Sequence, residues 1–235
     1  MIINPYRFAA AGGGIKDNLV AWYDLEETTG TRVDAHSTYD LTENGTIGST
    51  TGVVGTAADH TALNTDSLYH PDDAAFDITG DLTVAGWLDS SNVSGGSTAI
   101  IGKSNGTGNQ RSYLLYRSVG KLRFLVCSDG TSGGNTIAES TASISANTWY
   151  FVVGVFKAND VVELWVDGAS AVTPVSAPAS LHSGTAQLEL FSFNSGGVST
   201  EPATLDSVAI WSRALSSAEI STLYNSGSGV SYADL

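Results

Sequence analysis

The chain has 235 residues, 26 of them glycine, and its 24 acidic residues against 10 basic ones give a net charge of −14. Nucleic acids and anionic membranes attract basic surfaces, so we expect no nucleic-acid binding and no membrane insertion. The single cysteine, Cys127, excludes an intrachain disulfide and is expected to be a small, buried strand residue.

The first fourteen residues differ from the rest of the chain. A short apolar stretch, interrupted too early to be a secretory signal, precedes Gly12, Gly13 and Gly14. We therefore predict an N-terminal arm with a glycine hinge, residues 1–14, and one domain, residues 15–235. Two roles of the arm stay open: a terminus that is free or lies on the domain's own edge, and a tether that docks on a partner. The docking residues would be Ile2, Ile3, Tyr6 and Phe8.

Short runs of Val, Ile, Trp, Tyr and Phe then recur about every ten residues, with Gly, Asn and Ser between them, which is typical of many strands joined by turns. Asp167 and Gly168 predict a tight hairpin turn, because glycine accepts a positive φ. The sequence therefore predicts a single all-β domain. The expected strands cover residues 18–24, 66–70, 82–89, 98–103, 112–117, 120–127, 135–139, 148–157, 160–167, 170–174, 186–193 and 203–212.

One short helix is expected near the C-terminus. Ser216 and Glu219 have the spacing of a capping box, in which each side chain bonds a backbone N–H of the other residue. Ile220, Leu223 and Tyr224 would then form one apolar helical face. Gly227 follows the last of them, where a left-handed residue that ends the helix is easiest to place.

Four stretches, taken in this order, resemble one known family. They are LVAWYDLEE (residues 19–27), FDITGDLTVAGWL (76–88), NTWYFVVGVF with VELWVDG (147–156 and 162–168) and LDSVAIWSRALSSAEI (205–220). Together they resemble laminin G-like, or concanavalin A-like, jelly-roll domains. The resemblance implies a two-sheet antiparallel jelly-roll sandwich with one short C-terminal helix. It says less about function, because one fold hosts many functions.

We expect no enzymatic activity. Glucanases of this fold carry two or three acids close together on one strand, and glycoside hydrolysis needs a pair of carboxylates on either side of the scissile bond. The closest candidate is Glu163 with Asp167, which lacks a third acid at the required spacing. The histidines form no zinc motif.

Calcium is the cation expected from the resemblance. In this fold a structural ion often links the first strand to the last, and the matching carboxylates here are Asp24, Glu26 and Asp206. The alternative is that Asp24 and Asp206 accept hydrogen bonds from backbone amides at strand ends.

Glycan binding is the ligand class that the resemblance implies. It needs an aromatic face for stacking with polar groups nearby. The candidates, chosen because they lie near the loop around residues 105–109, are Asn109, Tyr113, Tyr116 and Arg117. The five tryptophans are expected to serve packing instead.

Two functions follow from these observations. The first is a non-enzymatic structural or decoration protein of a tailed-bacteriophage virion, since the apolar start followed by glycines resembles such proteins. It would dock on other virion proteins through its arm, form a homo-oligomer and contact host-surface glycans. The alternative is an extracellular carbohydrate-binding or adhesion module.

Overall fold

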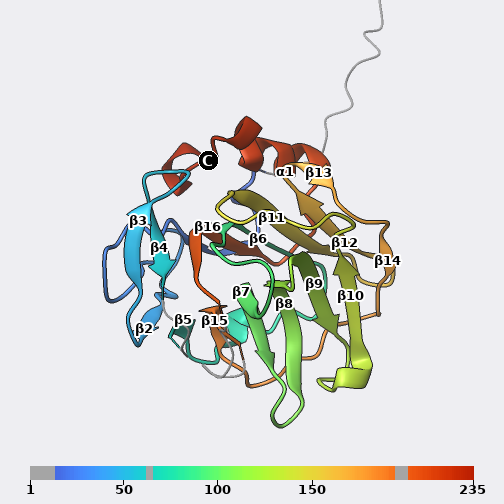
Figure 1. The fold of residues 1–235 in the computed structure, drawn as a ribbon. Helices are drawn as coiled ribbons and strands as arrows, with labels where there is room; N and C mark the ends of the chain where they lie inside the picture. Colours follow the sequence, from blue (N-terminus) through green and yellow to red (C-terminus); the bar gives the residue numbers. More distant parts are fainter. Residues whose placement is uncertain (1–13, 62–65, 194–200) are drawn as a thin grey trace, which may run out of the picture.

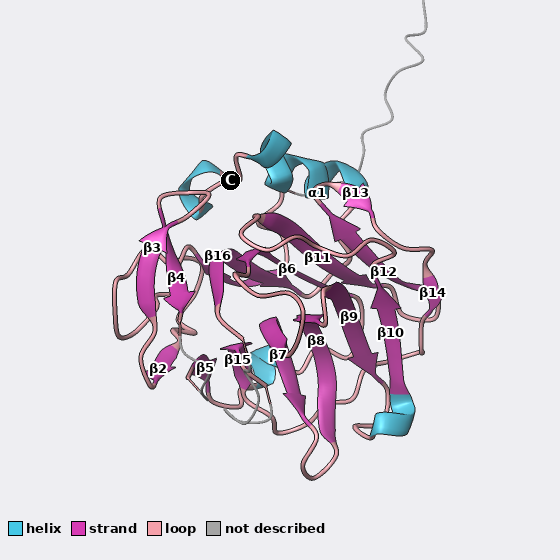
Figure 2. Ribbon diagram, viewed as in Figure 1, coloured by secondary structure: helices cyan, strands magenta, loops and turns pink. Residues whose placement is uncertain are grey.

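The computed structural model describes residues 14–61, 66–193 and 201–235, and in this part of the chain two antiparallel sheets pack into a sandwich (Figures 1 and 2). The fold is the all-β jelly-roll sandwich with one short C-terminal helix that the sequence predicts. The predicted docking residues Ile2, Ile3, Tyr6 and Phe8 lie outside the described residues.

The first sheet has nine strands. Seven of them are ordered β13 (Ala169–Ser170), β12 (Val161–Val166), β11 (Tyr150–Phe156), β6 (Leu82–Asp89), β16 (Ala203–Trp211), β4 (Thr56–His60) and β3 (Gly48–Thr51). In addition β1 (Leu19–Tyr23) pairs with β16, and β14 (Val175–Ser176) pairs with β12.

The second sheet has seven strands. Their order is β10 (Asn135–Glu139), β9 (Lys121–Cys127), β8 (Gln110–Ser118), β7 (Ser97–Asn105), β15 (Leu188–Phe191), β5 (Ser67–His70) and β2 (Thr42–Asn44). The only α-helix in the described ranges is α1 (Ser217–Tyr224), and short 3-10 turns span Ala74–Phe76, Ser132–Gly134, Asn225–Gly227 and Tyr232–Asp234. In Figure 1, α1 and the C-terminus lie at the top of the molecule, while β7, β8 and β9 lie lower, on the other sheet.

The first and last strands lie side by side. β1 pairs with β16 in antiparallel register, so that Leu19 faces Trp211 and Tyr23 faces Val208. This pairing closes the domain with segments that are about 190 residues apart in the sequence, counted from those pairs. The core lies between the two sheets and includes Tyr23, Phe124 and Phe156, all fully buried.

Most predicted strands are confirmed within one or two residues at each end. The prediction misses β2, β3, β4 and β14, which are short and mostly polar, and the strand expected at residues 170–174 is reduced to the two residues of β13. The turn prediction is confirmed: Asp167 (φ 51°) and Gly168 (φ 75°) join β12 to β13. Two successive positive φ values are what a tight type I′ hairpin requires.

The capping box of α1 is also confirmed. The Ser216 side chain accepts from the Glu219 N–H, and the Glu219 carboxylate accepts from the Ser216 N–H at 2.8 Å. The helix ends earlier than predicted, however. Asn225 is the left-handed residue (φ 47°) at its C-terminus, because asparagine also tolerates this conformation, and Gly227 comes two residues later.

Candidate functional site

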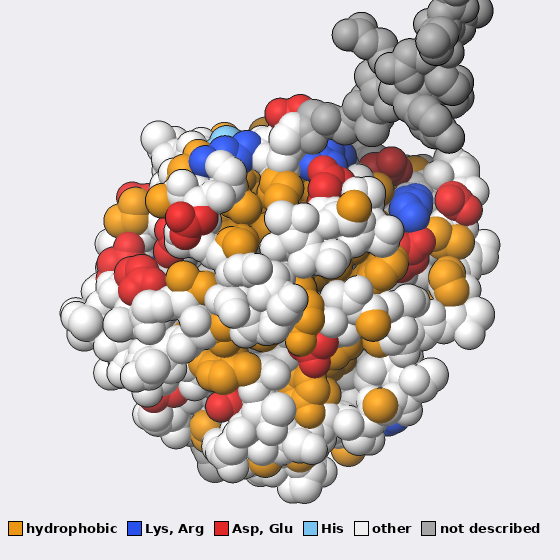
Figure 3. Space-filling view, turned by 90° about the horizontal axis from the view of Figure 1, so that it is seen from above, with side chains coloured by type: hydrophobic (Ala, Val, Ile, Leu, Met, Phe, Trp, Pro, Cys, Tyr) orange, Lys and Arg blue, Asp and Glu red, His pale blue; other side chains and the backbone are white. Residues whose placement is uncertain are grey.

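The outer face of the nine-stranded sheet carries a second apolar layer, and we call it the covered face. Along β11, Val152 and Phe156 point into the core between the sheets, whereas Phe151, Val153 and Val155 point outward. α1 lies on this layer, with Ile220 and Leu223 buried against it. Figure 3 views the molecule from the side of α1 and the C-terminus, and hydrophobic side chains are visible there between polar and charged ones.

The tryptophans belong to this layer. Trp22 meets Trp211 edge to face with ring centroids 6.1 Å apart, and the Trp211 Nε1–H donates to the carbonyl of Ile15 at 2.7 Å. All five lie in or against the layer: Trp22, Trp87 and Trp211 are buried, and Trp149 and Trp165 are half-buried. Their packing role therefore agrees with the sequence prediction.

The outer face of the seven-stranded sheet has no such cover from α1, and we call it the open face. Its side chains form two rows across β10, β9, β8 and β7. The first row holds Glu139, Arg123, Tyr116 and Ala99, and the second holds Ile137, Leu125, Leu114 and Gly102. A groove of about 290 Å³ lies on this face.

The groove has an apolar and a polar part. The apolar part is formed by Leu114, Tyr116, Leu125 and Phe193. The polar part is formed by Ser97, Ser104, Ser118, Arg111 and Arg123. This mixture suits a ligand that has both apolar faces and hydroxyl groups.

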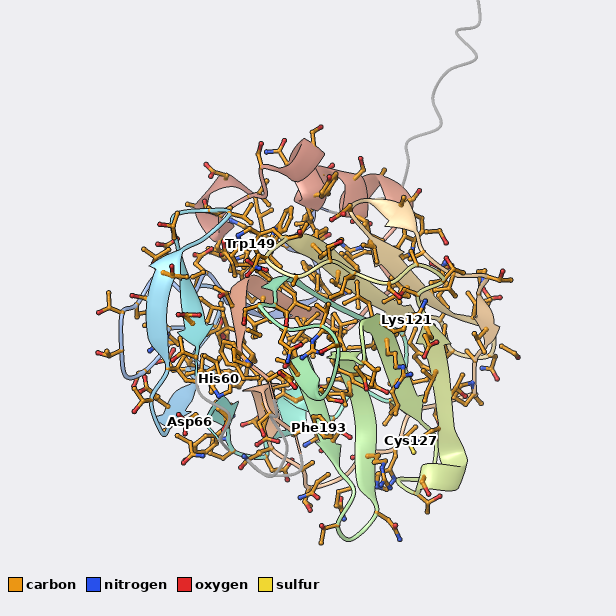
Figure 4. The ribbon with its side chains drawn as sticks, in the orientation of Figure 1. His60, Asp66, Lys121, Cys127, Trp149 and Phe193 are labelled. Carbon is orange, nitrogen blue, oxygen red and sulfur yellow. The ribbon has the colours of Figure 1, made fainter. Side chains whose placement is uncertain are left out.

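Small residues on β7 explain why the face is hollow there. Ala99 faces Tyr116 across the strands, and a Cβ at Gly102 would lie 2.5 Å from Cδ1 of Leu114. The rings of Tyr116 and Phe193 lie 6.4 Å apart. Figure 4 shows Phe193 beside β7 and β15, and Cys127 at the far end of β9. The groove thus lies where the large outward side chains of β8 meet the small outward residues of β7.

Two of the four predicted glycan residues are not accessible, and the structure corrects the prediction for them. Tyr113 is fully buried and its hydroxyl donates to the carbonyl of Phe76, because β8 turns this residue toward the core. Arg117 is also fully buried and donates to the carbonyl of Gly95 at 2.8 Å.

The other two predicted residues lie at or near the groove. Tyr116 lines it, with 8% of its surface exposed. Asn109 lies exposed in the loop just before β8, two residues from Arg111. Their role as ligand contacts stays a prediction. Sequence reasoning missed Arg111, Arg123 and Phe193, although the cross-strand pairing of Arg123 with Tyr116 follows once β8 and β9 are joined as a hairpin.

Two of the three predicted calcium ligands accept hydrogen bonds from separate segments. Asp24 Oδ1 accepts from Trp22 Nε1 at 2.7 Å and from the backbone N–H of Tyr232 at 3.0 Å. Glu26 Oε2 accepts from the backbone N–H and the hydroxyl of Thr56, both at 2.9 Å. These contacts correspond to the alternative in which the carboxylates satisfy backbone amides.

Asp206 is the third predicted ligand and is fully buried on β16. Its Oδ2 accepts from the N–H groups of Val53 (2.7 Å) and Val54 (2.9 Å), and its Oδ1 accepts from the Ser207 hydroxyl. Burial raises the pKa of Asp206 to about 6, with a further contribution from Glu26, and the hydrogen bonds only partly oppose this rise. Within the described residues, no group of three His, Cys, Asp or Glu side chains is placed to hold a metal, and calcium binding stays a prediction.

The acids considered for catalysis have structural partners. Glu163 forms an ion pair with Lys157 at 2.7 Å and accepts from Trp165 Nε1 at 3.0 Å. Asp167 accepts from the N–H of Phe151 at 2.9 Å, and burial raises the pKa of Asp167. Cys127 is buried as predicted, and burial raises the pKa of its thiol, which disfavours the reactive thiolate. Among the described helices, none has the length and apolar character needed to cross a bilayer.

Comparisons with known proteins agree with this geometry. A sequence model described as the concanavalin A-like lectin/glucanases superfamily matches residues 62–221. A search of curated proteins found no match.

The similar solved structures include binding domains of clostridial toxins. The binding domain of Paraclostridial Mosquitocidal Protein 1 has a TM-score of 0.72 at 15% identity, covering 91% of this chain and 53% of that one. The ligand-binding domain of botulinum neurotoxin serotype D, solved in complex with N-acetylneuraminic acid, has a TM-score of 0.66 at 14% identity, covering 89% and 51%. The chain thus spans about half the length of these structures, and the low identities show a shared fold.

Proposed function

The chain is a member of the concanavalin A-like lectin/glucanases superfamily, and we propose that it is a non-catalytic domain that binds a saccharide in the groove of the open face. One observation carries this proposal: α1 covers one outer face of the sandwich, while the other face keeps an apolar and polar groove. The toxin structures that share the fold are named as receptor- or ligand-binding domains, which supports a binding role.

The groove offers the contacts that a saccharide needs. The rings of Tyr116 and Phe193 present apolar surface to the C–H face of a sugar, and Ser97, Ser104 and Ser118 offer hydroxyls to sugar hydroxyls. Arg123 already bonds Glu139 at 2.6 Å and lies 6.0 Å from the centre of the Tyr116 ring. The ion pair and the ring therefore hold each other in place before any ligand arrives.

A glycan array tests this proposal. Wild-type protein is expected to bind a limited set of saccharides, and Phe193→Ala is expected to weaken that binding at least tenfold because it removes one stacking surface. Val33→Ala is the matched control, since Val33 is an exposed apolar residue (51%) outside the groove. An array without any bound saccharide, or equal binding by wild type and Phe193→Ala, contradicts the proposal.

We also propose the finer assignment, a virion decoration protein of a tailed bacteriophage that displays this domain. Two observations support this assignment. The apolar N-terminal stretch followed by glycines resembles such proteins, and the first described residues lie beside α1. Arg213, next to α1, donates to the carbonyls of Asp17 (2.7 Å) and Gly14 (3.3 Å), so the first described residues lie on the covered side, away from the groove. Self-association and docking on other virion proteins belong to this proposal.

Deleting residues 1–14 separates the virion role from the alternative, an extracellular adhesion module. Under the virion proposal, the shortened protein is lost from purified particles but still binds saccharide. Unchanged incorporation into particles, or no incorporation of the full chain at all, contradicts the virion proposal and leaves the adhesion module.

A further inference from the structure

We propose that the groove selects an acidic saccharide and that Arg111 binds its anionic group. This inference rests on the proposed saccharide binding and adds the class of ligand. It follows from three features of Arg111: the absence of a side-chain partner among the described residues, the local irregularity of β8 that brings it into the groove, and the charges around it.

Arg111 is unusual among the basic residues of this acidic chain. Its backbone N–H bonds the carbonyl of Gly130, but its guanidinium has no hydrogen bond or ion pair within the described ranges. The other described cations all have partners: Lys16 with Tyr232, Arg32 with Glu43, Lys103 with Asp72, Arg117 with Thr98, Lys121 with Thr141, Arg123 with Glu139, Lys157 with Glu163 and Arg213 with Glu219. Among the described residues, the one cation without a side-chain partner therefore lines the groove.

A β-bulge in β8 places Arg111 there. Lys103 and Ser104 are neighbours on β7, but they face Tyr113 and Arg111 on β8, so Ser112 is an extra residue. In a regular strand Arg111 would point to the same side as Tyr113, into the core, because residues two apart share a face. The bulge shifts it to the side of Leu114, and bulges commonly re-aim a side chain in this way near functional sites.

Two acids on the strands beside the groove already have partners among the described residues, so neither forms an ion pair with Arg111. Glu139 is paired with Arg123. Glu189, on the neighbouring β15, is only 1% exposed and accepts from Gln187 at 2.8 Å. More distant acids contribute less, because charges separated by more than about 8 Å are largely screened at physiological salt. The net charge of −14 therefore does not prevent an anion from binding at this end of the groove.

The spacing suggests how such a ligand lies. Arg111 and Tyr116 are five residues apart on β8, which is roughly 16 Å at the usual rise of a strand and somewhat less across the bulge. One sugar ring does not cover that length, so an oligosaccharide would place its acidic ring at Arg111 and another ring against Tyr116. A guanidinium fork holds a carboxylate through two parallel N–H donors, which gives orientation as well as affinity.

Matched pairs of glycans test the inference on the full chain. The array carries sialylated glycans beside their desialylated forms, and oligouronates beside their methyl esters. We expect binding only to the charged member of one or more pairs. Arg111→Gln is expected to weaken this binding at least tenfold, because it removes a charge-assisted hydrogen-bond pair, and Arg111→Lys is expected to fall in between.

Lys121→Gln is the control with the same loss of charge, since Lys121 lies at the start of β9, outside the groove, and is expected to bind as wild type. Equal binding of charged and neutral partners, or wild-type affinity of Arg111→Gln, overturns the acidic-ligand inference. If Phe193→Ala still weakens binding to glycans that are bound regardless of charge, the proposed saccharide function holds without the preference for acidic ligands. If no saccharide of either kind binds, both proposals fail.

Discussion

The two outer faces of the sandwich have a similar pattern of side chains but differ in what covers them. Both carry apolar side chains on alternate strand positions, but the covered face buries Trp22, Trp87 and Trp211 beneath α1 and the C-terminal residues, whereas the open face keeps a groove. Apolar surface that the chain covers itself contributes to stability. Apolar surface that stays accessible beside polar groups is instead available to a ligand.

Removing a large side chain from the covered face gives the largest expected loss of stability. Trp211→Ala removes a fully buried ring and its hydrogen bond to the carbonyl of Ile15, and we expect it to lower the free energy of unfolding by about 3–5 kcal/mol. Urea denaturation measures this value. A loss below about 1 kcal/mol would show that the layer beneath α1 is loosely packed.

The raised pKa of Asp206, on the covered side, predicts that the free energy of unfolding depends on pH. Its pKa is about 6 in the folded protein against an ordinary value of 3.8, so the folded state binds more protons between these values. This group therefore lowers the free energy of unfolding as the pH rises from about 4 to about 6, by at most about 3 kcal/mol. Asp206→Asn keeps an oxygen acceptor for Val53 and Val54 and removes the titration.

Denaturation of wild type and Asp206→Asn at several pH values measures the difference. We expect the variant to gain stability relative to wild type between pH 4 and pH 6, with little further change up to pH 8. Parallel curves for the two proteins over this range would show that Asp206 is not held in a buried, pKa-raising environment.

Removing the capping box of α1, on the same face, is expected to have a smaller effect on stability. Ser216→Ala removes the acceptor for the Glu219 N–H and is expected to lower the free energy of unfolding by about 1 kcal/mol at pH 7. The pKa of Glu219 is lowered to about 2, since hydrogen bonds from Arg213 and Ser216 outweigh the opposing effect of burial. This carboxylate therefore stabilises the fold above pH 4.5, and its contribution is lost as the pH falls toward 2.

Thermal unfolding of Ser216→Ala at pH 7 and at pH 2 checks this prediction. The variant is expected to differ less from wild type at the lower pH, where Glu219 is becoming protonated. An equal difference at both values would mean that the charge of Glu219 plays no part in the cap.

The open face should show the smallest loss of stability. Phe193→Ala removes a half-buried ring that no part of α1 covers, and we expect the free energy of unfolding to fall by less than about 1 kcal/mol. Urea denaturation beside Trp211→Ala gives a direct comparison. Similar losses in the two variants would erase the distinction between a structural face and a binding face.

The sequence predicts the covered face better than the open one. The capping box at Ser216 and Glu219 and the apolar positions of α1 are local patterns, so they can be recognised without the fold. The groove depends on pairing between strands. The small residues Ala99 and Gly102 make a hollow only because Tyr116 and Leu114 face them, and neighbours of this kind are not visible along the chain.

The two buried glycan candidates show the same limit. Tyr113 and Arg117 lie close to Tyr116 in sequence, yet strand alternation turns Tyr113 inward. Arg111 lies just before the strand predicted at residues 112–117. Regular alternation along β8 would place it on the core side with Tyr113, and only the bulge at Ser112 turns it outward.

The most direct test of the account is an NMR titration of the full chain with a saccharide identified on the array. We predict chemical-shift changes in β7, β8 and β9 and at Phe193, with the signals of β1, β16 and α1 unchanged. Changes concentrated in α1 and the tryptophan layer, with β8 silent, would contradict the claim that the open face is the binding face.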